Sequence, residues 1–398
     1  MILLPFIGML PLFLLANSID LGLFVFILII LTISYCALFI LYANGWKHLQ
    51  EFEFNNLYVP STKVSIIIPA RNEQDVIKNC IDGILLQNYS AWFEVIVIND
   101  HSTDNTLSIL QSYGNQIVLI NLADEIANKT NPLAFKKKAI ELAIYKAQGD
   151  LIITTDADTC RGKNWILSFV QCFEKNKFKI IASPVNYLPE KSVLKIFQII
   201  DFITMQGITA ASLYYHFNST CNGANLAYSK KVFLEVEGFK GIDSIASGDD
   251  MLLLHKIEKK YPRSAYYLKA NEAMVSTFAM PNLSSFLQQR IRWASKAKHY
   301  SDKRVTAVLA AVFIYNIFLF IMMLLVFIGK FNLFTFVVLI AIKIGIEFLL
   351  VKPVSIFFSQ QKLLIWHTLL QPFHILYVIV CGFLGQVKNY NWKGRKTK

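Results

Sequence analysis

The chain has 398 residues, of which 55% are hydrophobic, and it carries a formal net charge of +12. Its six cysteines are scattered without a CxxC pair, which argues against a disulfide framework and against a zinc site built on such pairs. The positive charge requires no nucleic-acid partner, because a basic face against anionic membrane lipids and a site for a phosphate-bearing ligand are sufficient to explain it.

The hydrophobic residues are concentrated toward the two ends of the chain. Residues 21–43 carry no charge and are long enough to cross a hydrocarbon core of roughly 30 Å. The length of this run, and the lack of a basic segment before it, are typical of a retained anchor rather than a cleaved signal peptide. Residues 1–16 are apolar but broken by two prolines, and they suit a short interfacial or re-entrant piece. We therefore expect three parts: an N-terminal membrane part at 1–46, a globular part at 47–303 and a C-terminal membrane part at 304–398.

Basic residues near the membrane ends predict the orientation. Lys47 follows the first span, whereas Asp20 precedes it. The globular part also ends in a basic stretch beside the second hydrophobic region, at Lys296, Lys298, Lys303 and Arg304. Because positive residues favour the cytoplasmic side, we expect a multi-pass integral membrane protein of the cytoplasmic membrane, with the globular part in the cytoplasm.

Short β-rich runs alternate with helical patterns in the first half of the globular part. The expected strands are residues 64–68, 93–98, 117–120 and 151–155, and the expected helices are 75–86, 103–113 and 135–147. This alternation predicts an α/β fold with a doubly wound, mainly parallel sheet. Ligands bind such sheets beyond the carboxyl ends of the strands, and polar clusters occur there at 69–73, 99–104 and 156–158.

Each of the first two clusters offers one acid as a candidate ligand. The first strand is expected to stop at Pro69, and Glu73 in the loop after it suits either a ligand or the N-terminus of the next helix. After the second strand, Asp100 can accept hydrogen bonds from a base or a ribose. Residues 102–104 are expected to cap the following helix instead.

Lys136, Lys137 and Lys138 open the next expected helix, although cations at a helix N-terminus oppose the helix dipole. A nearby phosphate would explain them, and a solvated run of charge is the alternative.

Asp156 and Asp158 follow the fourth strand. Two carboxylates separated by one residue at a strand end can bind a hard divalent cation, which then bridges a diphosphate. Such a pair is a weak signal alone, and its place after a strand of a βαβ unit strengthens it.

Two later stretches, 193–217 and 283–293, are amphipathic and suit either the membrane surface or the core of the globular part. Between them, Asp249 and Asp250 precede a helical run at 251–257. Paired acids at a helix start are common caps, but adjacent carboxylates also suit general-base chemistry.

Two arginines and a tryptophan, Arg290, Arg292 and Trp293, stand just before the second hydrophobic region. Both residue types are common at membrane interfaces, so this segment could simply anchor the chain there. An arginine that points into the site would instead stabilise a departing diphosphate.

Taken in order, these segments resemble the family 2 inverting glycosyltransferases, which have the GT-A fold. The resemblance covers residues 64–293. The stretch VSIIIPARNE resembles the opening strand and loop of the family, and VINDHSTDNT resembles its second strand, with Asn99 where an Asp is more usual. Lys136 followed by Ala139 is similar to the K-x-x-A stretch near the diphosphate, with Phe135 in place of the usual glycine.

The later motifs continue the resemblance. Residues 156–158 match the D-x-D metal motif, and residues 222–225 resemble the glycine-containing loop near the donor sugar and the acceptor. Residues 248–250 fall where the catalytic-base motif lies. Residues 289–293 match Q-x-x-R-W, which is prominent in membrane synthases of hyaluronan, cellulose, chitin and poly-N-acetylglucosamine and is present in related glycolipid enzymes.

The resemblance implies a nucleotide-sugar donor, with UDP as the expected nucleotide, and a lipid or saccharide acceptor. It implies a single in-line displacement in which Asp250, with Asp249 beside it, takes the acceptor proton. Mg²⁺ or Mn²⁺ on Asp158 and Asp156, together with Arg292, would offset the charge of the departing diphosphate. The residues implied to contact the donor are Pro69, Ala70, Arg71, Glu73, Asp100, Lys136, Asp156, Asn222, Gly223, Ala224, Gln289 and Trp293.

The C-terminal part predicts two spans, near 305–328 and 331–351, and a third hydrophobic stretch at 363–387 that contains Pro372. Three full crossings would place the basic tail outside, against the positive-inside rule. Either the last stretch does not cross simply or part of 352–372 crosses as well.

Lys343 and Glu347 lie one helical turn apart inside the second of these spans. They could mark a transport path, or they could form a neutralising pair packed between helices.

Three functions remain open at this point. A single-addition enzyme that glycosylates a lipid, or that acts at one step of envelope polysaccharide assembly, fits the short chain and the few spans. A processive polysaccharide synthase fits Q-x-x-R-W. The third is a non-enzymatic scaffold or transporter that binds nucleotides. A dehydrogenase gets little support, because no G-x-G-x-x-G follows the first strand.

Overall fold

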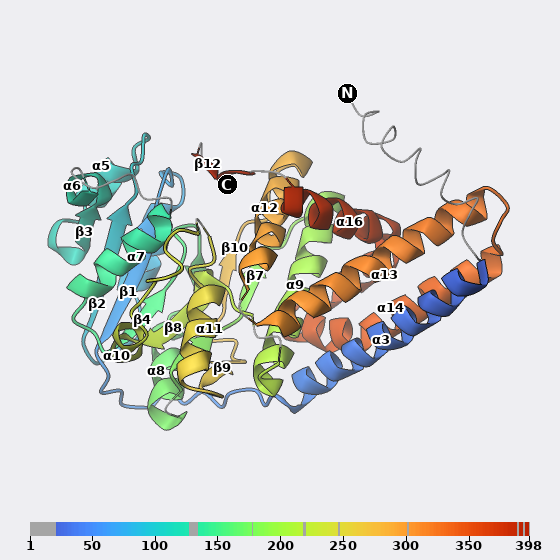
Figure 1. Ribbon diagram of the computed structural model, residues 1–398. Coiled ribbons are helices and arrows are strands. Elements are labelled where there is room, and N and C mark those ends of the chain that lie inside the picture. The colour runs from blue at the N-terminus through green and yellow to red at the C-terminus, as the bar shows by residue number, and fades with distance from the viewer. Residues whose placement is uncertain are drawn as a thin grey trace.

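The computed structural model describes residues 21–126, 134–176, 178–217, 220–245, 247–300, 302–387, 390–392 and 395–397. A seven-stranded sheet with the order β3-β2-β1-β4-β8-β6-β9 lies at one end of the molecule (Figure 1). Long apolar helices extend away from it toward the other end. The segment at 1–16 lies outside the described residues.

The first half of the sheet is parallel throughout. Its strands are β1 Val64–Ala70, β2 Phe93–Asn99, β3 Val118–Asn121 and β4 Leu151–Thr154. The helices between them are α4 Ile77–Leu85, α5 Thr106–Gln111, α6 Leu122–Ile126 and α7 Phe135–Lys146. The chain adds β2 and β3 on one side of β1 and then returns to add β4 on the other side. This reversal beside β1 creates a crevice at the carboxyl ends of the strands.

The expected end of the first strand at Pro69 is wrong, because β1 continues to Ala70. Pro69 pairs with Ile98 of β2, whereas the pairing with β4 ends at Ile67. Proline lacks a backbone N–H. Because the pairing with β4 ends before Pro69, the missing N–H costs no hydrogen bond on that side of the strand.

The second half of the sheet brings in one reversed strand. β8 Leu226–Ser229 runs antiparallel between β4 and β6 Ile180–Ala182, and β9 Ala265–Tyr267 pairs parallel with β6. The predicted mainly parallel, doubly wound α/β sheet is thereby confirmed. A smaller sheet combines β5 Cys160–Arg161, β10 Val275–Thr277 and β7 Val185–Tyr187. The remaining helices of this part are α8 Trp165–Asn176, α10 Lys230–Glu235, α11 Met251–Lys260 and α12 Leu283–Ser295.

Within the described residues, four helices are long and apolar enough to cross a membrane. They are α3 Leu21–His48, α9 Val193–Tyr215, α13 Lys303–Phe327 and α14 Leu333–Phe357. The last hydrophobic stretch forms Gln361–Leu369, which includes α15 Leu364–Leu369, and then α16 Gln371–Val387, with a bend of 74°. This bend agrees with the expectation that the last stretch does not cross simply. These apolar helices are compatible with a membrane location.

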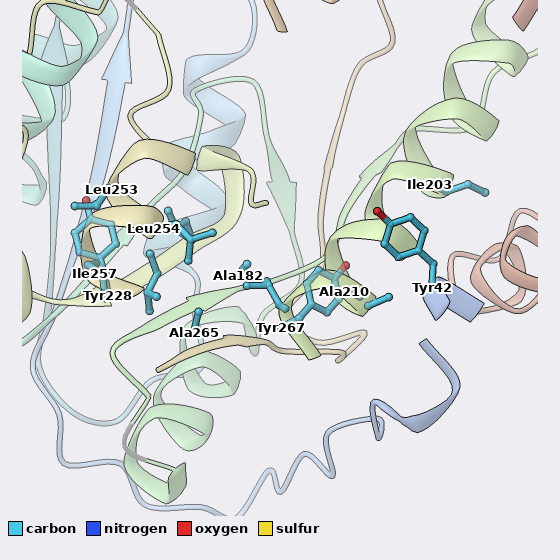
Figure 2. Close-up of a cluster of buried hydrophobic side chains, with 14 of the residues drawn as sticks. Tyr42, Ala182, Ile203, Ala210, Tyr228, Leu253, Leu254, Ile257, Ala265 and Tyr267 are labelled. Atoms are coloured by element: carbon cyan, nitrogen blue, oxygen red, sulfur yellow. The ribbon is translucent and has the colours of Figure 1, made fainter. Parts of the chain in front are cut away.

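The core joins the sheet to these helices. Alternate residues of β1 point to opposite faces, so Ile66 and Ile68 pack with α4 and α8, whereas Ile67 packs with α7 and α11. The cluster that contains Ile67 continues into α9 and α3. Figure 2 shows part of it, with Tyr42 of α3 close to Ile203 of α9.

The sequence allowed two positions for helix α9, at the membrane surface or in the protein core. The helix is mostly buried between the sheets and the other long helices. It packs on α3 and α14 on one side and on β7 and β9 on the other. α12 packs along α16 in the same layer (Figure 1).

A buried lysine ties the first long helix to the sheet domain. Lys269, in the loop between β9 and β10, donates to the carbonyls of Trp46 and Leu49 at 3.4 and 3.3 Å. Its ammonium also lies 4.3 Å from the centre of the Trp46 ring. A cation at the end of a helix complements the helix dipole. Residues 50–63 then cross to β1 as an extended segment without helix or strand.

Lys343 and Glu347 form an ion pair of 2.5 Å inside the long helices, with side chains that are almost fully buried. Glu347 also accepts hydrogen bonds from Tyr35 and from Gln371. The neutralising-pair interpretation is therefore the one that the geometry supports.

Short pieces complete the described structure: η1 Gly114–Gln116, η2 Gly223–Asn225, η3 Lys296–His299, η4 Gln361–Leu363, β11 Tyr390–Trp392 and β12 Arg395–Thr397.

Candidate active site

One cavity of about 1010 Å³ opens at the carboxyl ends of β1, β2 and β4. Its wall includes every residue that the sequence proposed for the site. They come from loops and helices spread between positions 69 and 293: Pro69, Ala70, Arg71, Glu73, Asp100, Lys136, Asp156, Asp158, Asn222, Gly223, Ala224, Asp249, Asp250, Gln289, Arg292 and Trp293.

The loops after β1 and β2 hold each other. Arg71 donates to the carbonyls of Asp100 and His101 at 2.8 and 3.1 Å. The carboxylate of Asp100 is almost fully buried and lies 2.9 Å from Nδ1 of His101. The side chain of Arg71 thus supports the loop that carries Asp100, in addition to lining the cavity.

The expected capping of α5 by residues 102–104 is only partly right. Asp104 accepts from the backbone N–H of Thr106 at 3.0 Å, at the start of the helix. Ser102 instead accepts from the backbone N–H of Asn72, and Thr103 donates its backbone N–H to the side chain of Asn72. The neighbouring loop competes successfully for these two residues because the parallel strands bring both loops to one edge.

The acidic pair after β4 faces a lysine. Lys136, in the first turn of α7, lies 3.0 Å from Oδ1 of Asp156 and 3.3 Å from Oδ2 of Asp249. Burial lowers the pKa of Lys136, but the two carboxylates outweigh burial and hold that pKa well above its usual value. Asp158 is oriented by Thr277 of β10, which donates to its Oδ2 at 3.0 Å.

The three lysines of α7 have three different positions. Lys136 faces the cavity, and Lys138 pairs with Glu141 on the same helix at 2.8 Å. Lys137 is buried and donates to the carbonyls of Ile242 and Ile245. The interpretation as one solvated run of charge is therefore wrong.

Asp250 is the N-cap of α11 and is held on three sides. Its Oδ2 accepts from the backbone N–H of Gly223 at 3.1 Å, its Oδ1 accepts from that of Met251 at 2.7 Å, and Lys296 lies 3.6 Å from Oδ1. Burial raises the pKa of Asp250, but Lys296, these N–H groups and Lys136 together lower it below its usual value. Each carboxylate oxygen keeps a second lone pair, so Asp250 can still accept a proton from a ligand.

Gly223 lies where a side chain would be crowded. A Cβ at this position would be 3.3 Å from Oδ2 of Asp249 and 3.5 Å from Cβ of Asp250. The same segment contains Asn225, which is fully buried and bonds to the carbonyls of Pro184 and Ala273 and to the indole of Trp165. Asn225 thus fixes the segment from behind, and Gly223 lets it approach the acids.

Helix α12 brings Gln289, Arg292 and Trp293 to the same cavity. Arg290 is buried on the helix, 2.9 Å from Asp201 of α9, with its guanidinium 4.2 Å from the centre of the Trp293 ring. Both arginines line the cavity, but they differ in environment, since Arg290 is buried and joins α12 to α9, whereas Arg292 is only partly buried.

The cavity continues past α12 between the long helices. Its far wall is formed mainly by apolar side chains of α3, α9, α13 and α16, among them Leu38, Phe197, Leu309, Phe313 and Val378. A few polar side chains also line it, namely Glu347, His367, Gln371 and His374. A polar end at the sheet and a mainly apolar end between helices thus belong to one continuous space.

Two supporting residues were not singled out for the site from the sequence. Lys296 was noted only for orientation, although its position one turn beyond Arg292 on a helical path could have placed it near the site. Thr277 gave no signal, because the pairing of β10 with β5 that brings it to Asp158 joins segments more than 100 residues apart.

The acidic pair fits a divalent cation that is shared with a ligand. Among the described residues, no group of three His, Cys, Asp or Glu side chains could hold a metal ion alone. A hard cation is commonly held by one or two carboxylates together with substrate phosphates, and Asp156 and Asp158 on one cavity wall supply that number.

Comparisons with known proteins agree with this geometry. A family model described as Glycosyl transferase family 2 matches residues 65–235, and one described as Glycosyl transferase family group 2 matches residues 151–384. A poly(ribitol-phosphate) beta-glucosyltransferase of Bacillus spizizenii is 28% identical over 134 residues, which are 33% of this chain and 20% of that protein. A poly-beta-1,6-N-acetyl-D-glucosamine synthase of Staphylococcus aureus is 22% identical over 236 residues, or 58% of this chain and 53% of that protein.

This chain thus spans about half, or less, of the length of these curated relatives. Among solved structures, a mannosyltransferase of Pyrobaculum calidifontis in complex with GDP-mannose and Mn²⁺ has a TM-score of 0.54 and 18% identity. The match covers 87% of this chain and 98% of that one, so the likeness of fold includes the long helices as well as the sheet.

Proposed function

Because this chain belongs to glycosyltransferase family 2, we propose that it is a membrane-bound inverting enzyme with the GT-A fold. It moves a sugar from a nucleotide-diphosphate sugar to a hydroxyl group of a lipid or saccharide acceptor. The observation that carries this proposal is the single cavity, which joins the acids and Lys136 at the strand ends to apolar walls between the long helices.

The donor occupies the polar end of the cavity. The loops that contain Arg71 and Asp100 receive the base and ribose, because they lie at the switch point beside β1. UDP is the nucleotide we favour. Lys136 and Arg292, which both line the cavity, face the diphosphate.

Asp158, with Asp156 beside it, would hold Mg²⁺ or Mn²⁺. When bound, the cation supplies positive charge next to the two phosphates of the donor. The solved mannosyltransferase of similar fold contains Mn²⁺, which supports a divalent cation in this chain as well.

The reaction is one in-line displacement. Asp250 takes the proton of the acceptor hydroxyl, and the oxygen attacks the anomeric carbon while the bond to the diphosphate breaks. The nucleoside diphosphate leaves with the electron pair, and the sugar inverts its configuration. Lys136 and Arg292 offset the charge on the leaving group, and Asp249 keeps Lys136 in place.

A single transfer to a lipid acceptor is our first choice. The apolar walls of α3, α9 and α13 continue directly from the acids, so a lipid tail could lie between the helices with its head group near Asp250. Processive synthesis is the second candidate. It is favoured by the Q-x-x-R-W segment and by the similarity to a poly-N-acetylglucosamine synthase over 236 residues.

We further propose three parts in the chain: membrane segments at 1–46, a cytoplasmic catalytic domain at 47–303 and a multi-pass membrane region at 304–398. Three of the four long apolar helices, α3, α13 and α14, lie in the proposed membrane parts, and together with the basic residues beside them they support this arrangement. Protease accessibility in sealed membrane vesicles tests the cytoplasmic side directly.

The decisive experiment uses the purified full-length chain with a native lipid extract and Mn²⁺ or Mg²⁺. UDP-glucose, UDP-N-acetylglucosamine and GDP-mannose are offered in turn, and nucleoside diphosphate release and product mass are measured. We expect a lipid that is heavier by one sugar residue, strongly reduced product formation in Asp250→Asn, and loss of activity with a chelator that either cation reverses. Polymer on a gel would identify a synthase, and donor binding without release would leave a scaffold.

A further inference from the structure

The segment between α10 and α11 leads to Asp249 and Asp250. Lysine side chains donate hydrogen bonds to its backbone carbonyls. Lys260 donates to the carbonyl of Glu235 at 2.7 Å, and Lys256 donates to those of Gly238 and Lys240 at 2.6 and 2.8 Å. Lys137 donates to those of Ile242 and Ile245 at 2.7 and 2.8 Å. Four carbonyl groups in the described part of this segment, and that of Glu235 at the end of α10, are thus paired with three ammonium groups.

Lys137 differs from the other two lysines in its origin and its burial. Lys256 and Lys260 belong to α11, the helix that follows the segment, whereas Lys137 comes from α7, 105 residues before Ile242 in the chain. Its side chain is only 1% exposed. A buried ammonium is costly unless it is paired, and the two carbonyls supply that pairing.

The charges around Lys137 affect its pKa in opposite directions. Burial lowers its pKa to about 8, and Lys296 adds to the lowering, while Asp249, Asp250 and Asp243 oppose it. The acid pair thus favours the charged form of Lys137, whose hydrogen bonds go to the segment before these acids.

Adjacent residues of α7 reach two different parts of the site: Lys136 lines the cavity, whereas Lys137 is buried behind it. Lys136 contacts Asp156 and Asp249, and Lys137 holds the segment that ends in the acid pair. Cations in the first turn of a helix are opposed by the helix dipole, so their presence requires compensating contacts. Both lysines have such contacts, and together they connect the strand-end acids with the segment before α11.

We propose that Lys137 is a positioning residue, which sets the place of Asp249 and Asp250 relative to the donor by holding the segment at Ile242 and Ile245. This inference rests on the proposed glycosyl transfer, in which Asp250 is the base. A displacement of about 1 Å at a reacting group can cost roughly a hundredfold in rate. A loosened segment should therefore slow the chemical step and leave donor binding largely intact.

The test compares Lys137→Met with Lys138→Met in the full-length chain. Lys138 is the matched control, because it lies next in sequence, carries the same charge and only pairs with Glu141 on its own helix. With the donor that the wild type consumes, we expect kcat of Lys137→Met to fall roughly 10- to 100-fold, with donor KM within about threefold. Lys138→Met should match the wild type in both constants.

Lys137→Gln serves if the methionine variant does not fold. Its shorter amide cannot reach both carbonyls, yet it keeps a polar group in the buried position, and the same fall in kcat is expected. Thermal unfolding and the fraction of protein that binds UDP report whether either variant is intact.

The proposal is overturned if folded Lys137 variants keep the kcat of Lys138→Met, or if their loss appears in donor KM instead of kcat. It is also overturned if the loss equals the loss of folded, UDP-binding protein. If the wild type releases no nucleoside diphosphate from any donor, the proposed function itself is wrong. If the wild type is active and the Lys137 variants have a normal rate, only the role of Lys137 is wrong.

Discussion

Asp250 illustrates how a single residue can serve both the fold and the proposed reaction. It caps α11 through the backbone N–H of Met251, and it accepts the N–H of Gly223 from a different part of the chain. Lys296 lies beside it at 3.6 Å. A base in this setting is ionised at neutral pH, because the surrounding donors and the ammonium favour the charged carboxylate.

Asp250→Asn should reduce the transfer rate by roughly 100- to 10,000-fold, which is the usual contribution of a general base. The amide keeps the size of the side chain, so nucleotide binding should remain. Single-turnover rates with the preferred donor measure the effect. A variant with normal kcat would exclude Asp250 as the base.

Lys296→Gln should move the acid limb of the pH–rate profile to higher pH. The ammonium lowers the pKa of Asp250, so its removal raises that pKa, and a base with a raised pKa is protonated over a wider acidic range. The profile of kcat/KM between about pH 4 and 8 tests the direction. An acid limb at an unchanged pH would assign it to another group.

Gly223→Ala should lower kcat by about tenfold, because a new Cβ at 3.3 Å from Asp249 pushes the acid pair by a few tenths of an ångström. Gly83→Ala is the matched control. Gly83 lies within α4 with open space around its Cβ position, so that change should leave activity normal and add about 0.5–1 kcal/mol of stability. Equal activity in the two variants would contradict a close approach at Gly223.

At the scale of elements, the segment between α3 and β1 shows how an irregular stretch can be held without helix or strand. Glu174 of α8 accepts hydrogen bonds from the backbone and hydroxyl groups of Ser61 and Thr62 and from the hydroxyl of Tyr58. At its other end, Phe52 donates its backbone N–H to the carbonyl of Lys269 at 2.8 Å. The connection between the first long helix and the sheet is therefore attached at both ends.

Glu174→Gln should lower the thermal stability at neutral pH and lose this effect in acid. Burial raises the pKa of Glu174, but the hydrogen bonds outweigh it and lower that pKa to about 2. A depressed pKa in the folded state means that the stabilisation is present above the unfolded pKa, near 4.5, and disappears as the pH falls toward 2. Melting curves at several pH values give the comparison. A difference that stays constant from pH 7 to about 3 would contradict it.

Elements also show what the sequence could and could not predict. The strands beside the site were predictable because β1, β2 and β4 are short apolar runs that each end in a polar cluster. The separate places of Lys136, Lys137 and Lys138 were not, since adjacent lysines look alike until the segment near Ile245 folds against one of them. For the same reason the role of Arg290 depended on Asp201, which lies almost 90 residues away.

At the scale of the whole molecule, the long helices are held together by buried polar contacts as well as by apolar packing. Lys343 and Glu347 of α14 pair with each other, and Gln371 of α16 bonds to both of them. Tyr35 of α3 donates to Glu347. Three helices are thus fixed in register at one level.

Lys343→Met should destabilise the folded chain by about 3–5 kcal/mol, because it leaves a buried carboxylate without its counter-ion. The double change of Lys343→Met and Glu347→Leu should cost less, since apolar replacement of a buried pair is often close to neutral. Thermal unfolding in lipid nanodiscs compares the two. If the single variant is as stable as the double variant, leaving Glu347 without Lys343 has no measurable cost in stability, and the prediction is wrong.

The continuous cavity has a practical consequence for anyone who wants a water-soluble fragment of this protein. Cutting the chain at about 47 and 303 would discard Leu38, Leu309 and Phe313 from the wall, and it would expose the side chains of α9 that pack on α3 and α14. Such a fragment would keep the donor half of the space and open the other half to water. Screening for compounds that compete with the acceptor therefore calls for the intact chain in lipid.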